Sequence, residues 1–245
     1  MITLCIPYYE SPKMLAKQVE YWNYYEDSVA ERFEIVVVDD GSPRNPAEDV
    51  LRGVSCKIAM RLYRIQQNIP WNVEGALNLA IHNARTEWIY SLAVDHVLPG
   101  TSAAILLNKE LCPKLYYRAL RHDVNERGIP VHEPRKGLGN LFLMTKELFD
   151  RAGGYNEYFA GYYGGAGNAF KRHLNSVAKE GTLNDVWLLH FGDGACVADA
   201  SVQDWGRQGS KYQVTPRMLA NGKKRPVNPL RFDWEEIKIH SYDTV

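Results

Sequence analysis

Two adjacent carboxylates, Asp39 and Asp40, end the apolar run 33–38 and stand directly before Gly41 and Ser42. The run is typical of a buried strand, and ligands of open α/β sheets bind just beyond the carboxyl ends of the strands. A carboxylate there can accept hydrogen bonds from a base imide or a ribose hydroxyl. The same residues also suit a turn and a helix cap, because Asp, Gly and Ser favour both. The motif alone leaves both interpretations open.

A second polar group follows another apolar run. The run 2–6 leads into Pro7, Tyr8, Tyr9 and Glu10. Ligands bind where the ends of neighbouring parallel strands meet, so we expect the two polar groups to face one crevice. The pair of strand ends therefore favours a ligand site over a simple turn.

The elements that must position these groups alternate between strands and helices. The segment between the runs 2–6 and 33–38 has apolar residues at helical spacing, namely Met14, Leu15, Val19 and Trp22. This predicts a βαβ unit, and a helix over 73–84 followed by a strand over 88–94 adds a further step. The pattern predicts an α/β fold with an open, mostly parallel sheet flanked by helices. A chain of 245 residues with 45% hydrophobic composition can form it as a single domain.

Bulk composition excludes several classes of protein. The chain has 29 basic and 29 acidic residues, so an anionic partner would need a local patch. Four scattered cysteines without a CxxC pair argue against a structural zinc site or a disulfide framework. No run of eighteen apolar residues and no leader pattern occurs, which predicts a cytoplasmic protein without a membrane span. The glycine motifs of dinucleotide-binding and P-loop enzymes are absent.

The two strand ends resemble those of the family-2 glycosyltransferases and their GT-A relatives. In that family the first strand typically ends in a proline, aromatic and acidic or amide cluster, and the second in Val-Asp-Asp-Gly-Ser. The resemblance implies a Rossmann-like GT-A domain that binds a nucleotide-sugar donor. It places Pro7, Tyr9, Glu10 and Asp39 around the nucleotide base, with Asp40 close to the ribose.

A third element of the resemblance opens the helix over 73–84. Relatives carry an asparagine, a glycine and a further asparagine here, which implies donor contacts from Asn68, Asn72, Gly75 and Asn78. Asn78 is expected to orient a carboxylate on the next strand. Trp71 suits core packing as well as a ligand contact.

The resemblance also divides the single domain, residues 1–245, into functional parts. Residues 1–100 form the nucleotide-sugar-binding half, 101–220 the acceptor half and 221–245 a C-terminal tail. The turn-forming residues after Asn221 predict that this tail lies over the surface. The oligomeric state stays open.

The expected metal site departs from the family. Most relatives carry Asp-x-Asp at the end of the strand that corresponds to residues 88–94, whereas this chain has Ala93, Val94 and Asp95 there. The stretch from Asp95 to Pro99 resembles a bacteriophage-type subset in which Asp95 is the second acid. Asp95 is then the catalytic and metal-binding carboxylate, and His190 is the candidate that completes coordination of Mn²⁺ or Mg²⁺. Because a charged ligand is missing, the metal is expected to be weakly bound or absent.

The acceptor loop departs as well. Relatives bear an acidic general base in a glycine-rich loop that corresponds to Gly164, Gly165, Ala166 and Gly167. Ala166 and Gly167 stand where the acid is expected, so the base lies elsewhere, with Asp193 the first candidate and Asp199 a weaker one. The alternative is a degenerate pseudo-glycosyltransferase that binds nucleotide-sugars or serves as a scaffold.

Basic residues in the acceptor half bear on the acceptor. They are Arg118, Arg121, Arg127, Arg135, Lys136, Lys171, Arg172, His173, Lys223, Lys224 and Arg225. Such groups can follow a phosphate backbone, as transfer to a hydroxymethylated base in phage DNA would require. They also suit a solvated surface, with a saccharide or lipid-linked glycan as the acceptor.

Overall fold

The computed structural model describes residues 1–69, 71–136, 141–162, 165–192 and 230–239. The strands of this part are β1 (Ile2–Tyr8), β2 (Phe33–Asp39), β3 (Ala59–Ile65), β4 (Trp88–Ser91), β5 (His96–Val97), β6 (Leu115–Asp123), β7 (Arg135–Lys136), β8 (Phe142–Thr145), β9 (Lys179–His190) and β10 (Trp234–Ile237). The helices are α1 (Pro12–Asn23), α2 (Asp27–Ala30), α3 (Ala47–Leu51), α4 (Val73–Asn83), α5 (Gly100–Leu107), α6 (Lys146–Ala152), α7 (Ala166–Val177) and the 3-10 helix η1 (Glu157–Phe159).

These strands form one sheet in the order β10-β3-β2-β1-β4-β8-β6-β9-β5, with β7 paired to β6. The predicted parallel arrangement holds for the N-terminal half, where β3, β2, β1 and β4 are all parallel. The whole sheet is mixed, because β8 runs antiparallel to both β4 and β6. The α/β class is confirmed, and the antiparallel pairs of the described residues involve β5, β7, β8 and β10.

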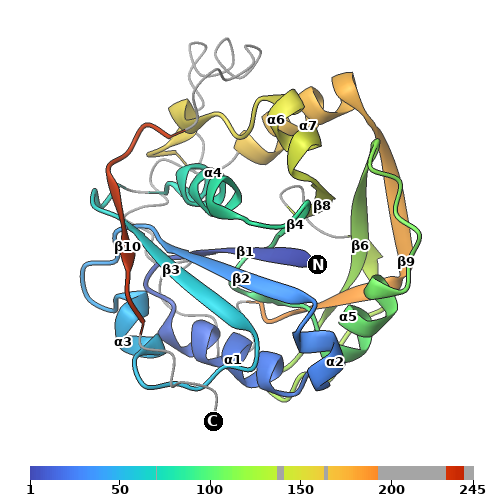
Figure 1. Cartoon of the computed structure of the whole chain (residues 1–245), viewed down its shortest axis with the longest axis horizontal. Helices are drawn as coiled ribbons and strands as arrows, with labels where there is room; N and C mark the ends of the chain where they lie inside the picture. Colours follow the sequence, from blue (N-terminus) through green and yellow to red (C-terminus); the bar gives the residue numbers. More distant parts are fainter. Residues whose placement is uncertain (70, 137–140, 163–164, 193–229, 240–245) are drawn as a thin grey trace.

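Helices cover both faces of the sheet (Figure 1), with α1, α2, α3 and α5 on one side and α4, α6 and α7 on the other. Every residue of β1 and β2 is buried, as expected for central parallel strands covered on both faces. Ile2, Leu4 and Ile6 of β1 pack into one core, and Cys5 packs into the other. The alternation of side chains along β1 thus contributes to both layers.

The C-terminal segment contributes a strand to the sheet. Strand β10 pairs antiparallel with β3 at the edge of the sheet, and Trp234 lies opposite Ile65. The sequence interpretation missed this strand because the turn-forming residues before it dominate the local pattern. Residues 221–229 and 240–245 lie outside the described residues.

The order of the strands creates a switch point at β1. From β1 the chain moves to β2 and β3 on one side and to β4 on the other. Strand β4 pairs with β1 only as far as Ser91 opposite Cys5, whereas β2 stays paired to the end of β1, where Asp39 lies opposite Tyr8. A crevice beyond the strand ends is expected at such a point.

Among the described helices, none combines the length and the apolar character that crossing a membrane requires.

Gly41, in the turn after β2, provides a test of this architecture. Its φ is +71°, and a Cβ atom there would lie 2.6 Å from the backbone oxygen of Gln67. Gly41→Ala is therefore expected to lower the free energy of unfolding by about 2 kcal/mol or more, the sum of left-handed strain and a backbone clash. Chemical denaturation measures this change.

Gly53→Ala is the matched control, because Gly53 has a φ of +73° with no atom within 4 Å of the added Cβ. It carries the strain without the clash and should cost about 1 kcal/mol. Equal losses in the two variants would contradict the close approach at Gly41.

Candidate active site

The ends of β1 and β2 are joined by hydrogen bonds at one edge of the sheet. The backbone N–H of Asp40 donates to the carbonyl of Tyr8 at 2.8 Å. The N–H of Glu10 donates to Ser42 Oγ at 3.0 Å. The two polar groups of the sequence therefore meet, as their strand ends predicted.

Both carboxylate oxygens of Asp39 accept hydrogen bonds from the segment that follows β2. Its Oδ1 accepts from the N–H of Ser42 and its Oδ2 from the N–H of Ala47 at the start of α3, both at 2.8 Å. Burial raises the pKa of its carboxyl, and these hydrogen bonds oppose the rise. In this structure, both carboxylate oxygens serve the turn-and-cap role that the sequence left open.

Glu10 organises the neighbouring loop in a similar way. Its carboxylate accepts from the backbone N–H groups of Arg44 and Asn45, at 2.8 and 3.1 Å, and from the Asn45 amide at 2.8 Å. Burial would raise the pKa of this carboxyl, but the hydrogen bonds outweigh it and hold the pKa below its usual range. Glu10 is 2% exposed, so it holds this loop from a buried position.

Asp40 fixes the start of α4. It accepts from the Asn72 side-chain amide at 2.9 Å and from the Asn72 N–H at 3.2 Å. Asn72 Oδ1 in turn caps α4 by accepting from the N–H of Gly75 at 3.3 Å. A Cβ at Gly75 would lie 2.6 Å from that Oδ1, so the glycine permits the cap. These three residues form one buried unit.

Asn78 orients a carboxylate, but not one on the next strand. Its side chain accepts from the N–H of Tyr155 and donates to the Tyr155 carbonyl and to Glu157 Oε1, all at 2.9 Å. Glu157 belongs to η1, after the Gly-Gly-Tyr-Asn turn, and its Oε2 accepts from the N–H of Arg231 at 2.8 Å. The expectation was wrong about the partner because contacts between distant segments are invisible in local sequence.

Of the residues predicted to contact the nucleotide-sugar, Tyr9 and Asn68 lie at the surface. The hydroxyl of Tyr9 donates to Asn68 Oδ1 at 3.1 Å, and both residues are at least partly exposed. Pro7, in contrast, is a buried residue of β1 opposite Val38. Of the predicted set, the pair Tyr9 and Asn68 can touch a ligand without rearrangement of the framework.

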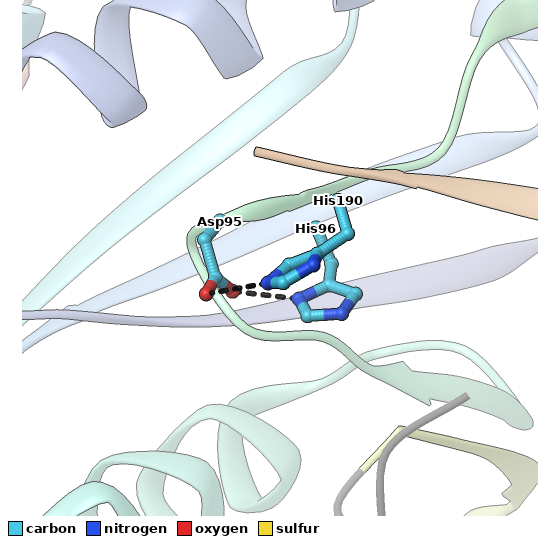
Figure 2. Close-up of side chains that lie close together, drawn as sticks. All are labelled: Asp95, His96 and His190. Carbon is cyan, nitrogen blue, oxygen red and sulfur yellow. Dashed lines mark hydrogen bonds and ion pairs between the residues drawn. The ribbon is translucent and has the colours of Figure 1, made fainter. Parts of the chain in front are cut away.

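Asp95, His96 and His190 form a compact group beyond the end of β4 (Figure 2). Asp95 Oδ1 lies 2.6 Å from His96 Nδ1, and Asp95 Oδ2 lies 3.5 Å from His190 Nε2. The two imidazole rings are stacked, with centroids 4.3 Å apart. Their ligand atoms lie within 4.8 Å of one another, close enough to hold one metal ion.

Backbone pairing holds this group in place. His96 pairs with His190 in the antiparallel ladder of β5 and β9. The N–H of Phe191 donates to the carbonyl of Asp95 at 2.9 Å. The buried side chain of Gln18, from α1, donates to the carbonyls of Val94 and His96 at 3.0 and 2.8 Å. The strand predicted over 88–94 thus ends at Ser91, because the chain turns at Val94 and Asp95.

Asp95, His96 and His190 influence one another's pKa values. Burial would raise the pKa of the Asp95 carboxyl, but the charges and hydrogen bonds of the two histidines outweigh it and hold the pKa far below its usual range. Burial lowers the pKa of His96. For His190 the hydrogen bonds to Asp95 and Asp123 outweigh burial and raise the pKa. The carboxylate is therefore ionised and available as a ligand.

The sequence interpretation did not single out His96, a member of this group, or Asp123, which contacts it. His96 is fully buried, and its Nε2 has no hydrogen-bond partner among the described residues. Asp123 Oδ1 lies 2.8 Å from His190 Nδ1. The sequence shows that His96 is adjacent to Asp95. It does not show the strand register that brings His96 and Asp123 to His190.

The described part of the predicted acceptor loop holds no acid. Gly165 caps α7, and Ala166 and Gly167 form its first turn. Ala166 is 2% exposed and packs with Phe159 and Ala169, so a carboxylate at this position would enter an apolar cluster. Gly164, Asp193 and Asp199 lie outside the described residues.

Several basic residues of the acceptor half are ion-paired. Lys136 and Lys171 each lie 2.8 Å from Glu180, and Arg118 lies 3.6 Å from it. Arg121 and Arg135 lie 3.7 and 2.5 Å from Asp123. Glu180 and Asp123 are therefore ion-paired with five of the basic residues. Residues 223–225 lie outside the described part of the chain.

Glu74 is a buried carboxyl that the sequence interpretation passed over. It lies in the first turn of α4, is 3% exposed, and its Oε2 has no hydrogen-bond partner among the described residues. Burial raises its pKa to about 8, with smaller contributions from Asp40 and Glu157. Glu74 is therefore largely protonated at neutral pH.

Comparisons with known proteins show what this chain is similar to. Residues 3–110 match the model of the family described as glycosyl transferase family 2, so this part of the chain is similar to that family. No curated protein matches it in sequence.

Solved structures share the fold at low identity. TarS residues 1–349 from S. aureus match with a TM-score of 0.60 at 17% identity, over 78% of this chain and 60% of that chain. The same fragment in complex with UDP-GlcNAc matches with 0.61 at 16% identity, over 81% and 61%. The mannosyltransferase PcManGT from Pyrobaculum calidifontis, in complex with GDP-Man and Mn²⁺, matches with 0.56 at 17% identity, over 90% and 68%. The chain thus spans less than two thirds of the TarS fragment.

The raised pKa of Glu74 predicts a pH-dependent loss of stability. The folded protein holds this proton to a pKa of about 8 against an ordinary value of 4.5, so stability falls as the pH rises between these values. Glu74→Gln should therefore raise the free energy of unfolding at pH 8, by at most about 5 kcal/mol, since one pKa unit is worth about 1.4 kcal/mol. Denaturant titrations at pH 5 and pH 8 measure the difference.

The matched control is Glu147→Gln, which removes an exposed carboxyl from the first turn of α6. A Glu74→Gln variant that is no more stable than the parent at pH 8 would show that Glu74 is solvated and charged.

Proposed function

We propose that this protein transfers a sugar from a nucleotide-diphosphate sugar to an acceptor hydroxyl. The observation that carries the proposal is the convergence of the ends of β1, β2 and β4 at the switch point, with Tyr9 and Asn68 at the surface and the Asp95 group beyond β4. The family match over residues 3–110 supports it. So do the similar structures, whose titles name UDP-GlcNAc and GDP-Man.

The predicted donor residues divide into two roles under this proposal. Tyr9 and Asn68 contact the nucleotide, with the Tyr9 ring available to stack on the base. The remaining set holds the loops that form the pocket and is buried: Pro7, Glu10, Asp39, Asp40, Asn72, Gly75 and Asn78. Uridine and guanosine diphosphate sugars are the donors to test first.

The residues present fit a divalent metal. Asp95 offers a carboxylate oxygen, and His96 and His190 offer the ring nitrogens that face it. This mixed oxygen and nitrogen set suits Mn²⁺ better than Mg²⁺, which prefers oxygen ligands. His96 supplies a third ligand where Ala93 lacks the family's first acid. When bound, such a metal neutralises charge on the departing nucleotide diphosphate.

Deprotonation of the acceptor is the least defined step. A general base must reach the attacking hydroxyl, and none of the described residues of the acceptor loop carries a carboxylate. Asp193 remains our candidate. The alternative is a nucleotide-sugar-binding pseudoenzyme, and a transfer assay with radiolabelled donor separates it from an enzyme.

For the acceptor, we place a saccharide or lipid-linked glycan ahead of DNA. Binding to DNA requires cations that can exchange counterions on phosphates. Five of the candidate cations are shared with Glu180 and Asp123, which reduces the charge available. A hydroxymethylated base in phage DNA is the second acceptor to assay.

Donor binding tests the proposal directly. Tyr9→Ala should weaken binding of the preferred nucleotide-sugar by about five- to 150-fold, because stacking of a base on an aromatic ring is worth about 1–3 kcal/mol. Isothermal titration calorimetry with UDP- and GDP-sugars measures it. Tyr24→Ala, which removes a tyrosine that is 72% exposed at the end of α1, should leave affinity unchanged. If no nucleotide-sugar binds the parent protein, the proposed function is wrong.

Metal binding is the second test. Asp95→Ala should abolish Mn²⁺ binding measured by electron paramagnetic resonance, since it removes the only carboxylate of the group. Ala93→Asp should tighten binding by restoring the second acid of the family pattern. Glu20→Ala, which removes a carboxylate from the surface of α1, is the control. Unchanged Mn²⁺ affinity in Asp95→Ala would place the metal elsewhere.

A further inference from the structure

Asp123 contacts His190 on the side of the ring that faces away from Asp95. His190 Nδ1 lies 2.8 Å from Asp123 Oδ1, within hydrogen-bonding distance, whereas His190 Nε2 lies 3.5 Å from Asp95 Oδ2. A neutral imidazole carries one proton and donates it from one nitrogen only. In the neutral ring the shorter contact therefore favours the proton on Nδ1, which leaves Nε2, beside Asp95, as the nitrogen that can bind a metal ion.

Asp123 is itself held in one orientation. Its Oδ2 lies 2.5 Å from Arg135 Nη2, and its Oδ1 faces His190 Nδ1 at 2.8 Å, with Arg121 Nε farther away at 3.7 Å. Strand pairing supports this placement, because Asp123 lies opposite His190 in the parallel ladder of β6 and β9, and the N–H of Val124 donates to the His190 carbonyl at 3.0 Å. The side chain is 18% exposed, so water competes little for the contact.

We propose that Asp123 is a positioning residue that fixes the Nδ1–H tautomer of His190 and so presents Nε2 as a metal ligand. The proposal rests on the metal site of the proposed function and extends it to a residue of the acceptor half. Carboxylates that accept from the second nitrogen of a ligating histidine orient the ring and raise its basicity. Asp123 performs this role without contacting the metal.

Arg135 makes the isosteric variant Asp123→Asn a sharp test. An arginine side chain only donates hydrogen bonds, so the amide oxygen of the new asparagine should face Arg135 and its NH₂ should face His190. The amide then donates to Nδ1 and moves the histidine proton to Nε2. The variant keeps the size of the side chain and reverses the tautomer.

The experiment measures the tautomer of His190 by ¹⁵N NMR of the full chain at pH 9, together with Mn²⁺ affinity by electron paramagnetic resonance with MnCl₂. We expect Nδ1–H in the parent protein, Nε2–H in Asp123→Asn, and about 10- to 100-fold weaker Mn²⁺ binding in the variant. Asp185→Asn, which changes an exposed aspartate on the same strand as His190, should alter neither measurement.

An Nε2–H tautomer in the parent protein would overturn the proposal. This measurement does not depend on whether a variant folds. An unchanged tautomer in a folded Asp123→Asn would overturn it as well. If the parent shows Nδ1–H, the variant reverses it, and neither protein binds Mn²⁺, the role of Asp123 in fixing the tautomer is upheld and the metal site of the proposed function fails.

Discussion

The parallel pairing of β1 with β2 on one side and β4 on the other is the constraint on which the site depends. Strand β4 stops opposite Cys5, while β2 remains paired to the end of β1 at Tyr8. The hydrogen-bond ladder therefore opens on one side only, and the loops after β1, β2 and β4 converge there. Strands β6 and β9 are parallel to each other, and their ends bring Asp123 and His190 to the Asp95 group.

Buried carboxylates hold this edge of the sheet together. Asp39, Asp40 and Glu10 lose contact with water, and the loss is offset by hydrogen bonds from backbone amides and asparagine side chains. Asp39 and Asp40 thus fix the loops at this edge of the sheet. Glu74 is the exception, since its Oε2 has no hydrogen-bond partner in the part of the chain that the structure describes and its raised pKa favours the protonated form.

The Asp95 group combines one carboxylate with two imidazoles. Ala93 offers no carboxylate, and His96 from β5 and His190 from β9 lie beside Asp95. Under the proposed function, a set of one carboxylate and two imidazoles would suit Mn²⁺ better than Mg²⁺. The chemistry of the group is thus defined by residues from both halves of the chain.

The sequence by itself determined the N-terminal elements. Apolar runs and helical spacing are local signals, so β1, β2 and α4 lie close to their predicted bounds, α1 contains the residues predicted to be helical, and the polar ends of β1 and β2 meet as expected.

Only the tertiary structure decided which polar groups contact one another. Asn78 reaches Glu157, and His190 reaches Asp123, across long stretches of chain. Burial of Ala166 against Phe159 and the pairing of β10 with β3 were hidden for the same reason. These contacts follow from strand register and from packing between distant segments, which neighbouring residues in the sequence do not encode.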